Sequence, residues 1–403
     1  MRVPFSPPRM DKKMADAVLD TLYSGWITTG PKTKKLEEEL TKYTGGKATV
    51  CLNSATAGLE LALRWLGVKE GDEVILPAYT YCATANVVMH CGATPVLVDV
   101  GDDFNIDVSK IEAAITRKTK VIMPVDIAGM PVDYDELREL LAKPAVRELF
   151  HPNSEQQIKL GRIMVLADAA HSIGANYKGR NSGTLADISS FSFHAVKNLP
   201  TAEGGAVIFN LPEQFDCLAV QKQFKVKSLH GQSKDALEKS KAGGWRYDIT
   251  EPGYKCNMTD INAALGLVEL ERYDSDMLVK RKSVFDKYNA LLEKHEWANI
   301  PVYKTEEKQS CFHIYMLRIN NATEDQRDRI IDKISAEKVA VNVHFQPLPL
   351  MTAYKEFDFK MEDYPVAWNN YQQEISLPVF YDITDEQIGW VIDALVKAVE
   401  EVM

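Results

Sequence analysis

Short apolar runs alternate with amphipathic stretches over most of the chain. The runs are too short for helices and end near turn-forming residues, so they predict buried β-strands at residues 50–52, 73–76, 95–100, 121–124, 163–166, 188–193 and 206–209. Apolar positions at helical spacing predict helices at residues 10–22, 32–43, 56–66 and 81–89. Because strands joined by helices usually pair in parallel, we expect an α/β fold whose mostly parallel central sheet is flanked by helices.

The pattern changes towards the C-terminal end. Residues 258–292 are strongly helical, and beyond them extended segments at 311–319 and 339–345 accompany helices at 324–336 and 385–402. We therefore expect a large domain of residues 1–290, with an N-terminal arm of residues 1–30, and a smaller α+β domain of residues 291–403. Residues 144–161 are polar and lack clear periodicity, which we interpret as a surface excursion of the large domain.

Composition narrows the class of protein. The chain has 403 residues and a net charge of −10, which argues against a nucleic-acid surface but allows anions to bind at local sites. Six scattered cysteines without a C-x-x-C pair predict neither a disulfide framework nor a zinc site. The first residues lack the apolar core of a signal peptide, and no apolar run reaches about 18 residues. We expect a cytoplasmic protein without a membrane span and without a metal.

A lysine lies shortly after the predicted strand at residues 188–193. Lys197 has Ser192 and Asn198 nearby, and the pair Gly204-Gly205 then allows the backbone to approach another group closely. A lysine at the edge of a sheet is usually an ordinary side chain that extends into solvent. Its neighbours instead favour a functional lysine.

A second candidate is Asp168, which ends the strand at residues 163–166 and precedes His171 by three positions. A carboxylate at the end of a buried strand is costly unless it is paired. The pyridinium nitrogen of pyridoxal phosphate (PLP) is one such partner, because holding it protonated makes that ring an electron sink. A helix N-cap is the alternative role for Asp168.

Two further segments follow predicted strands. The small residues and hydroxyls of residues 53–58 open a helix whose N-terminus could bind a phosphate, or could be an ordinary cap. Tyr81 could stack on a flat ring or belong to the core. All four segments lie at the carboxyl ends of predicted parallel strands, where such sheets bind ligands. No G-x-G-x-x-G follows a strand, which argues against a dinucleotide-binding oxidoreductase.

With these motifs in order, the chain resembles the fold-type-I PLP aminotransferases of the DegT/DnrJ/StrS group, which act on nucleotide-linked keto sugars. The resemblance covers nearly the whole chain. It rests on residues 24–31 (SGWITTGP), 54–58 (SATAG), 71–75 (GDEVI), 168–171 (DAAH), 191–198 (FSFHAVKN), 202–205 (AEGG) and 253–264 (GYKCNMTDINAA). The runs at 24–31 and 253–257 are most similar to the UDP-4-amino-4-deoxy-L-arabinose–oxoglutarate aminotransferases.

The resemblance implies a role for each candidate residue. Lys197 would form the Schiff base with PLP, and Asp168 would pair with the pyridine nitrogen. The other cofactor contacts it implies are Ser192, Ala55 and Thr56 at the phosphate, Tyr81 on the ring, and His171 near the cofactor oxygen. Substrate candidates are Trp26, Thr28, His194 and His344.

The resemblance also implies partners: L-glutamate or 2-oxoglutarate, a nucleotide-linked 4-keto sugar with UDP as the nucleotide, and a second copy of the chain. In such a homodimer, Lys255 or Asn257 would reach the phosphate of the neighbouring subunit.

The chain departs from the family pattern in several places. Many members have Gly-Tyr-Asn where this chain has Gly253-Tyr254-Lys255, with Asn257 two positions further on. Ala167 stands where an acid is common before the aspartate. Pro349 replaces the histidine of a Pro-Leu-His run near the sugar site, so His344 could contribute there instead. The excursion at 144–161 is also longer than usual.

Two other functions fit the same fold. One is a PLP-dependent sugar dehydratase, although such enzymes usually have histidine at the position of Lys197. The other is a non-catalytic regulator that keeps the PLP fold, against which the complete set of Lys197, Asp168 and Ser192 argues.

Overall fold

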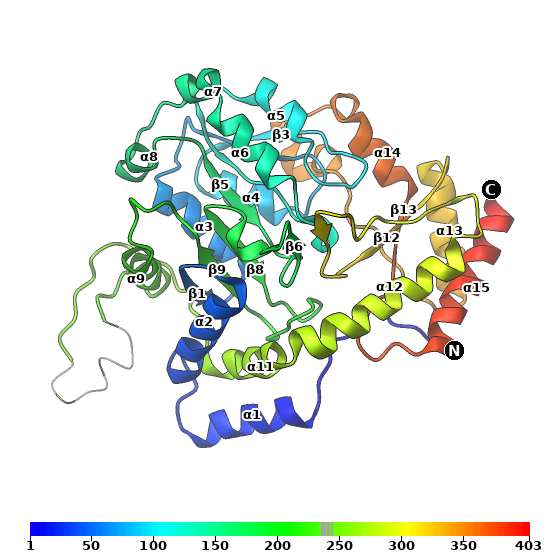
Figure 1. Ribbon diagram of the computed structural model, residues 1–403, viewed down its shortest axis with the longest axis horizontal. Helices are drawn as coiled ribbons and strands as arrows, with labels where there is room; N and C mark the ends of the chain where they lie inside the picture. The colour runs from blue at the N-terminus through cyan, green and yellow to red at the C-terminus, as the bar shows by residue number, and fades with distance from the viewer. Residues whose placement is uncertain (235–238, 240–241, 243–244) are drawn as a thin grey trace.

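The computed structural model describes residues 1–234, 239, 242 and 245–403 of the chain. A seven-stranded sheet forms its centre (Figure 1). Its strands, in spatial order, are β1 (Ala48–Leu52), β9 (Gly205–Phe209), β8 (Ile188–Ser192), β5 (Met164–Asp168), β4 (Thr119–Ile122), β2 (Glu73–Pro77) and β3 (Thr94–Val98). Only β9 runs antiparallel to its neighbours. The prediction of a mostly parallel α/β fold is confirmed.

Alternate residues of each strand enter different hydrophobic clusters, as a sheet buried on both faces requires. On β2, Val74 and Leu76 pack in one cluster, and Ile75 packs in the other. The first cluster includes residues of α3 (Ala55–Leu66), α4 (Ala83–His90) and α9 (Cys217–Ser228). The second includes residues of α2 (Pro31–Thr44), α5 (Val108–Ala114), α6 (Tyr134–Ala142) and α11 (Asp260–Glu271). Helices therefore cover both faces of the sheet.

A third hydrophobic cluster lies around a smaller antiparallel sheet towards the C-terminal end (Figure 1). Its strands are β10 (Ala298–Asn299), β12 (Tyr315–Ile319) and β13 (Glu374–Leu377). Its helices include α12 (Leu278–Leu292), α13 (Glu324–Ala336) and α15 (Asp385–Val402), and α14 (Pro365–Gln373) lies beside it. Val3 joins this cluster and pairs with Val339, so the N-terminus lies against the small domain. The boundary near residue 290 stays a prediction.

Local structure differs from the sequence prediction in several segments. The excursion at 144–161 contains two short helices, α7 (Pro144–Leu149) and α8 (Glu155–Leu160), because six residues are too few to display a helical period. A π-helical turn at Tyr273–Met277 divides the helix predicted at 258–292. Residues 339–345 make only isolated bridges instead of a strand. A small sheet of β6 (Asn176–Tyr177), β7 (Arg180–Asn181) and β11 (Lys308–Gln309) was not anticipated.

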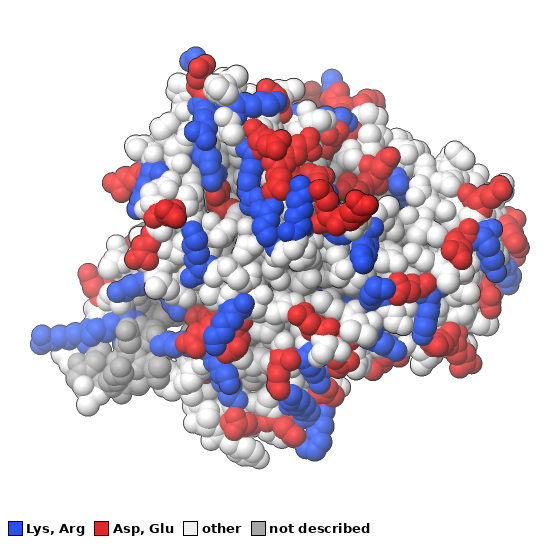
Figure 2. All heavy atoms as spheres, in the orientation of Figure 1, with Lys and Arg blue, Asp and Glu red and all other residues white. Residues whose placement is uncertain are grey.

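The remaining helix, α1 (Lys12–Tyr23), packs on α11. Acidic and basic side chains are interspersed over the face drawn in Figure 2, with no single basic stripe on that face. None of the helices within the described residues has both the length and the apolar character needed to cross a bilayer. The described residues also contain no group of three His, Cys, Asp or Glu that could hold a metal ion.

Candidate active site

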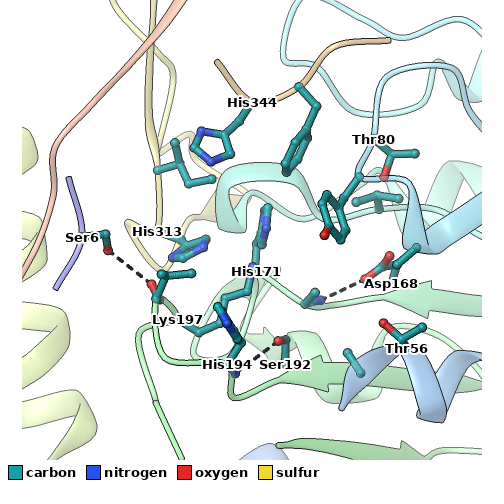
Figure 3. Close-up of a pocket in the computed structure, with 18 of the residues that line it drawn as sticks. Ser6, Thr56, Thr80, Asp168, His171, Ser192, His194, Lys197, His313 and His344 are labelled. Atoms are coloured by element: carbon teal, nitrogen blue, oxygen red, sulfur yellow. Dashed lines mark hydrogen bonds between the residues drawn. The ribbon is translucent and has the colours of Figure 1, made fainter. Parts of the chain in front are cut away.

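A cavity of about 410 Å³ opens where the carboxyl ends of β5 and β8 face the start of α3 (Figure 3). It brings together most of the site residues expected from the sequence: Ala55, Thr56, Tyr81, Asp168, His171, Ser192, His194, Lys197 and His344. The loop that carries Lys197 is closed by two backbone hydrogen bonds, from Phe193 N–H to Gly204 O and from Thr201 N–H to Phe193 O, both 2.8 Å. The lysine thus projects from a fixed turn.

The pKa of Lys197 is lowered, which favours the neutral amine. Burial lowers the pKa of its ammonium group to about 8, and the negative charge of Asp168 limits the fall. An amine with this pKa is partly unprotonated near neutral pH, whereas an ordinary lysine is almost wholly charged. The side chain can therefore act as a nucleophile or as a base.

Asp168 is a buried carboxyl that lacks an ion-pair partner within the described residues. Burial raises its pKa, against the opposing effect of hydrogen bonds from Thr84 Oγ1, 2.8 Å from Oδ2, and the N–H of Ala170, 3.2 Å from Oδ1. Thr84 in turn lies 2.9 Å from the hydroxyl of Thr80. A protonated ring nitrogen would complete this site, because it supplies the cation that a buried carboxylate requires.

The first turn of α3 is a candidate anion site. Ser54 caps the helix by accepting the N–H of Ala57, and the preceding N–H groups of Ala55 and Thr56 lie in the turn whose donors have no partners within the helix. Gly205 allows this turn to approach β9, because a Cβ at that position would lie 2.4 Å from the nitrogen of Ala55. The hydroxyl of Ser192 also lines the cavity. The lysine, the buried carboxyl and the anion site together fit the aldehyde, ring nitrogen and phosphate of PLP.

Aromatic side chains form another part of the wall. The rings of His171 and His313 are 4.6 Å apart between centroids, and His171 stacks against Phe345 at 5.9 Å. Burial lowers the pKa of both histidines well below the usual range, so both are neutral at physiological pH. Nδ1 of His313 lies 2.9 Å from Oδ1 of Asn198. The exposed ring of Tyr81 lies 5.7 Å from Phe345.

Several of these residues were not anticipated from the sequence. Thr84 lies on the buried side of a helix, and His313, Phe345 and Phe5 come from distant segments that enter the cavity only in the folded chain. The sequence indicated Asn198 only weakly as a site residue, through its position directly after Lys197.

Four expected site residues lie outside this cavity, in a separate cluster around Thr29: Trp26, Thr28, Lys255 and Asn257. Trp26 Nε1 donates to Thr29 O at 3.1 Å, and Asn257 Nδ2 donates to Thr29 Oγ1 at 2.6 Å. The ammonium of the exposed Lys255 contacts Oδ1 of Asn257. Within one chain, the cluster therefore joins the N-terminal loop to the segment before α11.

Comparison with known proteins agrees with this geometry. The sequence profile of the DegT/DnrJ/EryC1/StrS aminotransferase family matches residues 8–149 and 155–396. The chain belongs to this family.

Three proteins to which the chain is similar illustrate the comparison. A Streptococcus pneumoniae protein described as a sugar aminotransferase, Spr1654, has been solved with PMP and with PLP. Its PMP form is 47% identical, with a TM-score of 0.95 over 100% of both chains. The Bacillus subtilis spore coat polysaccharide biosynthesis protein SpsC is 36% identical over 98% of this chain and 96% of its own. Helicobacter pylori PseC, an aminotransferase of pseudoaminic acid biosynthesis, is 25% identical, with a TM-score of 0.86 over 100% of both chains. The protein is a PLP-dependent sugar aminotransferase.

The pKa of Lys197 leads to a pH prediction for this aminotransferase. Only the neutral amine attacks an aldehyde, so the rate at which PLP attaches to the apoprotein should rise with pH and level off above about 8. The measurement is the growth of the absorbance of the lysine-linked cofactor in stopped flow. Nα-acetyl-lysine is the control, and its rate should keep rising towards a pKa of about 10.4. If the rate in the protein also kept rising towards about pH 10.4, the lowered pKa of Lys197 would be contradicted.

Proposed function

We propose that this enzyme transfers an amino group from L-glutamate to a nucleotide-linked keto sugar, and that the acceptor is a UDP-linked 4-keto sugar. The observation that carries the proposal is the presence of both Lys197 and Asp168 in one cavity of about 410 Å³. The names of the relatives, which concern sugar aminotransfer, spore coat polysaccharide and pseudoaminic acid, support a sugar acceptor. The choice of UDP and of carbon 4 rests on the motifs at residues 24–31 and 253–257.

In this proposal each residue of the chain has a separate task. Bound PLP supplies the electron sink that makes the hydrogen on the amino-bearing carbon acidic. Lys197 would first hold the cofactor and, once displaced by the amino group of the donor, would take the proton from the amino-bearing carbon. Asp168 keeps a proton on the ring nitrogen, and the hydroxyl of Thr84 holds that carboxyl in place. Ser192 and the first turn of α3 anchor the phosphate.

The enzyme would act as a homodimer, and the Thr29 cluster would serve the site of the second subunit. This assignment is supported by the position of Lys255, whose ammonium is exposed and held by Asn257, itself anchored on Thr29. Between the two candidates, Lys255 is therefore the residue proposed to contact the partner's phosphate group. Trp26 and Thr28 would then border the bound sugar nucleotide.

A panel of acceptors tests the proposal. Enzyme converted to the PMP form with L-glutamate, and freed of excess donor, is mixed with UDP- and dTDP-linked 3-keto and 4-keto sugars. The UDP-linked 4-keto sugar is expected to restore the spectrum of the PLP form and to yield the amino sugar by mass spectrometry. If 2-oxoglutarate were the only compound to restore the PLP spectrum, a sugar acceptor would be refuted. A faster reaction with a dTDP-linked or a 3-keto sugar would refute the assignment to UDP or to carbon 4. A sugar dehydratase would release a deoxygenated sugar, and no amino sugar would be detected.

A further inference from the structure

A buried hydrogen-bonded chain leads from the small domain to the cavity. Nδ1 of His344 lies 2.8 Å from Ser376 Oγ, and that hydroxyl lies 2.5 Å from Oε1 of Glu374. The second carboxyl oxygen of Glu374 accepts the backbone N–H of His344 at 2.9 Å. Glu374 and Ser376 are two residues apart on β13, so their side chains share one face of the strand, and both residues are fully buried. Neither is needed for the chemistry described above.

The carboxyl of Glu374 lacks an ion pair within the described residues. The nearest guanidinium, of Arg327 on α13, donates instead to the backbone carbonyls of Tyr371 and Glu374, at 2.7 and 3.4 Å. The pKa of the buried Tyr79, which follows β2, is raised by burial and also by the charge of Glu374. Burial raises the pKa of Glu374 to about 8, with smaller opposing effects from Ser376, the N–H of His344 and Arg327. Glu374 is therefore mainly protonated below that pH.

The proton on Glu374 determines the direction of the hydrogen bonds. In the protonated acid the proton lies on Oε1, because Oε2 accepts the N–H of His344, and the carboxyl then donates to Ser376 Oγ; an ionised Glu374 would instead accept the serine hydroxyl. The serine hydroxyl then donates its own proton to Nδ1 of His344. Burial, together with the charge of Lys197, lowers the pKa of His344 to about 4, so the ring is neutral and carries its single proton on Nε2.

The ring of His344 is held in the cavity wall on both sides. Phe5 stacks on it at 5.5 Å between centroids and 22° between planes, and Phe345 meets it edge-on at 5.0 Å. Figure 3 shows the ring on the side of the cavity away from Ser192 and Thr56, where the phosphate would lie. With Nδ1 bonded to Ser376, Nε2 is the ring nitrogen that remains for a ligand, since no partner for it occurs in the described part of the chain.

We propose that Glu374 and Ser376 are positioning residues that fix the ring proton of His344 on Nε2, and that this N–H donates a hydrogen bond to a neutral oxygen of the acceptor sugar. A neutral donor suits a hydroxyl or keto oxygen, whereas the carboxylates of glutamate bind best to charged partners such as arginine. Only the identity of the acceptor rests on the proposed function. The assignment of the tautomer stands on the contacts among His344, Ser376 and Glu374 and on the burial of that carboxyl.

The tautomer is tested first, by nitrogen NMR of protein with ¹⁵N-labelled histidine, with the signals of His344 assigned by the variant His344→Gln. Wild type should show a neutral ring protonated on Nε2, and Ser376→Ala should show a mixture of tautomers. Glu374→Gln should keep the wild-type tautomer, because its carboxamide can accept the N–H of His344 and donate to Ser376 as the protonated acid does. Wild-type protein protonated on Nδ1 would overturn the relay even if Ser376→Ala failed to fold.

Half-reaction kinetics then test the contact with the acceptor. Ser376→Ala should raise the KM for the keto sugar about tenfold, the effect of one hydrogen bond, and leave the half-reaction with glutamate unchanged. Glu374→Gln should restore the wild-type KM. Ser189→Ala removes an equally buried serine from β8 and is the matched control. A shifted tautomer with an unchanged acceptor KM would overturn the substrate contact. If no keto sugar reacted, the proposed function would fail, whereas the NMR result would still decide the relay.

Discussion

Replacing Lys197 with alanine should abolish turnover, by more than about 10⁴-fold, because the variant loses both the nucleophile that holds the cofactor and the base that moves the proton. The absorbance of the lysine-linked cofactor should disappear as well. The fold should remain, since the side chain lines the cavity and has no ion pair among the described residues. The measurements are the spectrum after reconstitution with PLP and the rate of conversion of glutamate to 2-oxoglutarate.

A second buried lysine provides the control for this variant. Lys120 on β4 is 3% exposed, and burial lowers its pKa too, but it does not line the cavity. Lys120→Met should therefore keep the spectrum and the activity, even if it changes stability. An active Lys197→Ala enzyme, or an equal loss of cofactor attachment in Lys120→Met, would show that Lys197 has no special role.

Asp168→Asn should lower kcat about 10²- to 10³-fold, because the carboxamide has no negative charge to keep the ring nitrogen protonated. The cofactor should still attach to Lys197, which separates this variant from the first. Asp168 raises the pKa of Lys197, so its neutralisation should lower that pKa further. The rise in the rate of PLP attachment should then occur at lower pH than in wild type.

Two variants calibrate this result. Thr84→Val removes one hydrogen bond to the carboxyl but leaves its charge, and should cost about tenfold in rate. Asp99→Asn alters another buried aspartate, whose oxygens accept the N–H groups of Val366 and Ala367, and should affect stability without affecting the half-reaction. A wild-type rate in Asp168→Asn would refute the pairing of this carboxyl with the ring nitrogen.

The central sheet and part of the site could be predicted because their signals are local. Most strands of the sheet are apolar runs, and Asp168 and Lys197 are polar residues at or shortly after the ends of β5 and β8. Parallel strands place their carboxyl ends at one edge of the sheet, so residues far apart in sequence could be expected in one cavity.

The rest of the site depends on contacts between distant segments. In the sequence, Glu374 is a polar residue at the junction of a helix and a strand. The residues around it do not indicate that Ser376 connects it to His344. Phe5 reaches the cavity only because Val3 pairs with Val339 of the small domain. The six-residue helices α7 and α8 were missed for a different reason, since their period is too short to be seen.

The central claim is that this chain exchanges an amino group through PLP held by Lys197, and a single-turnover experiment tests it most directly. Purified enzyme reconstituted with PLP is mixed with excess L-glutamate, without a keto acceptor, and the cofactor is extracted and identified. We predict that the absorbance of the lysine-linked cofactor is lost, that PMP is recovered, and that 2-oxoglutarate appears in equal amount. The account would be contradicted if a protein with the lysine-linked spectrum returned unchanged PLP with L-glutamate and with every other amino donor used in its place.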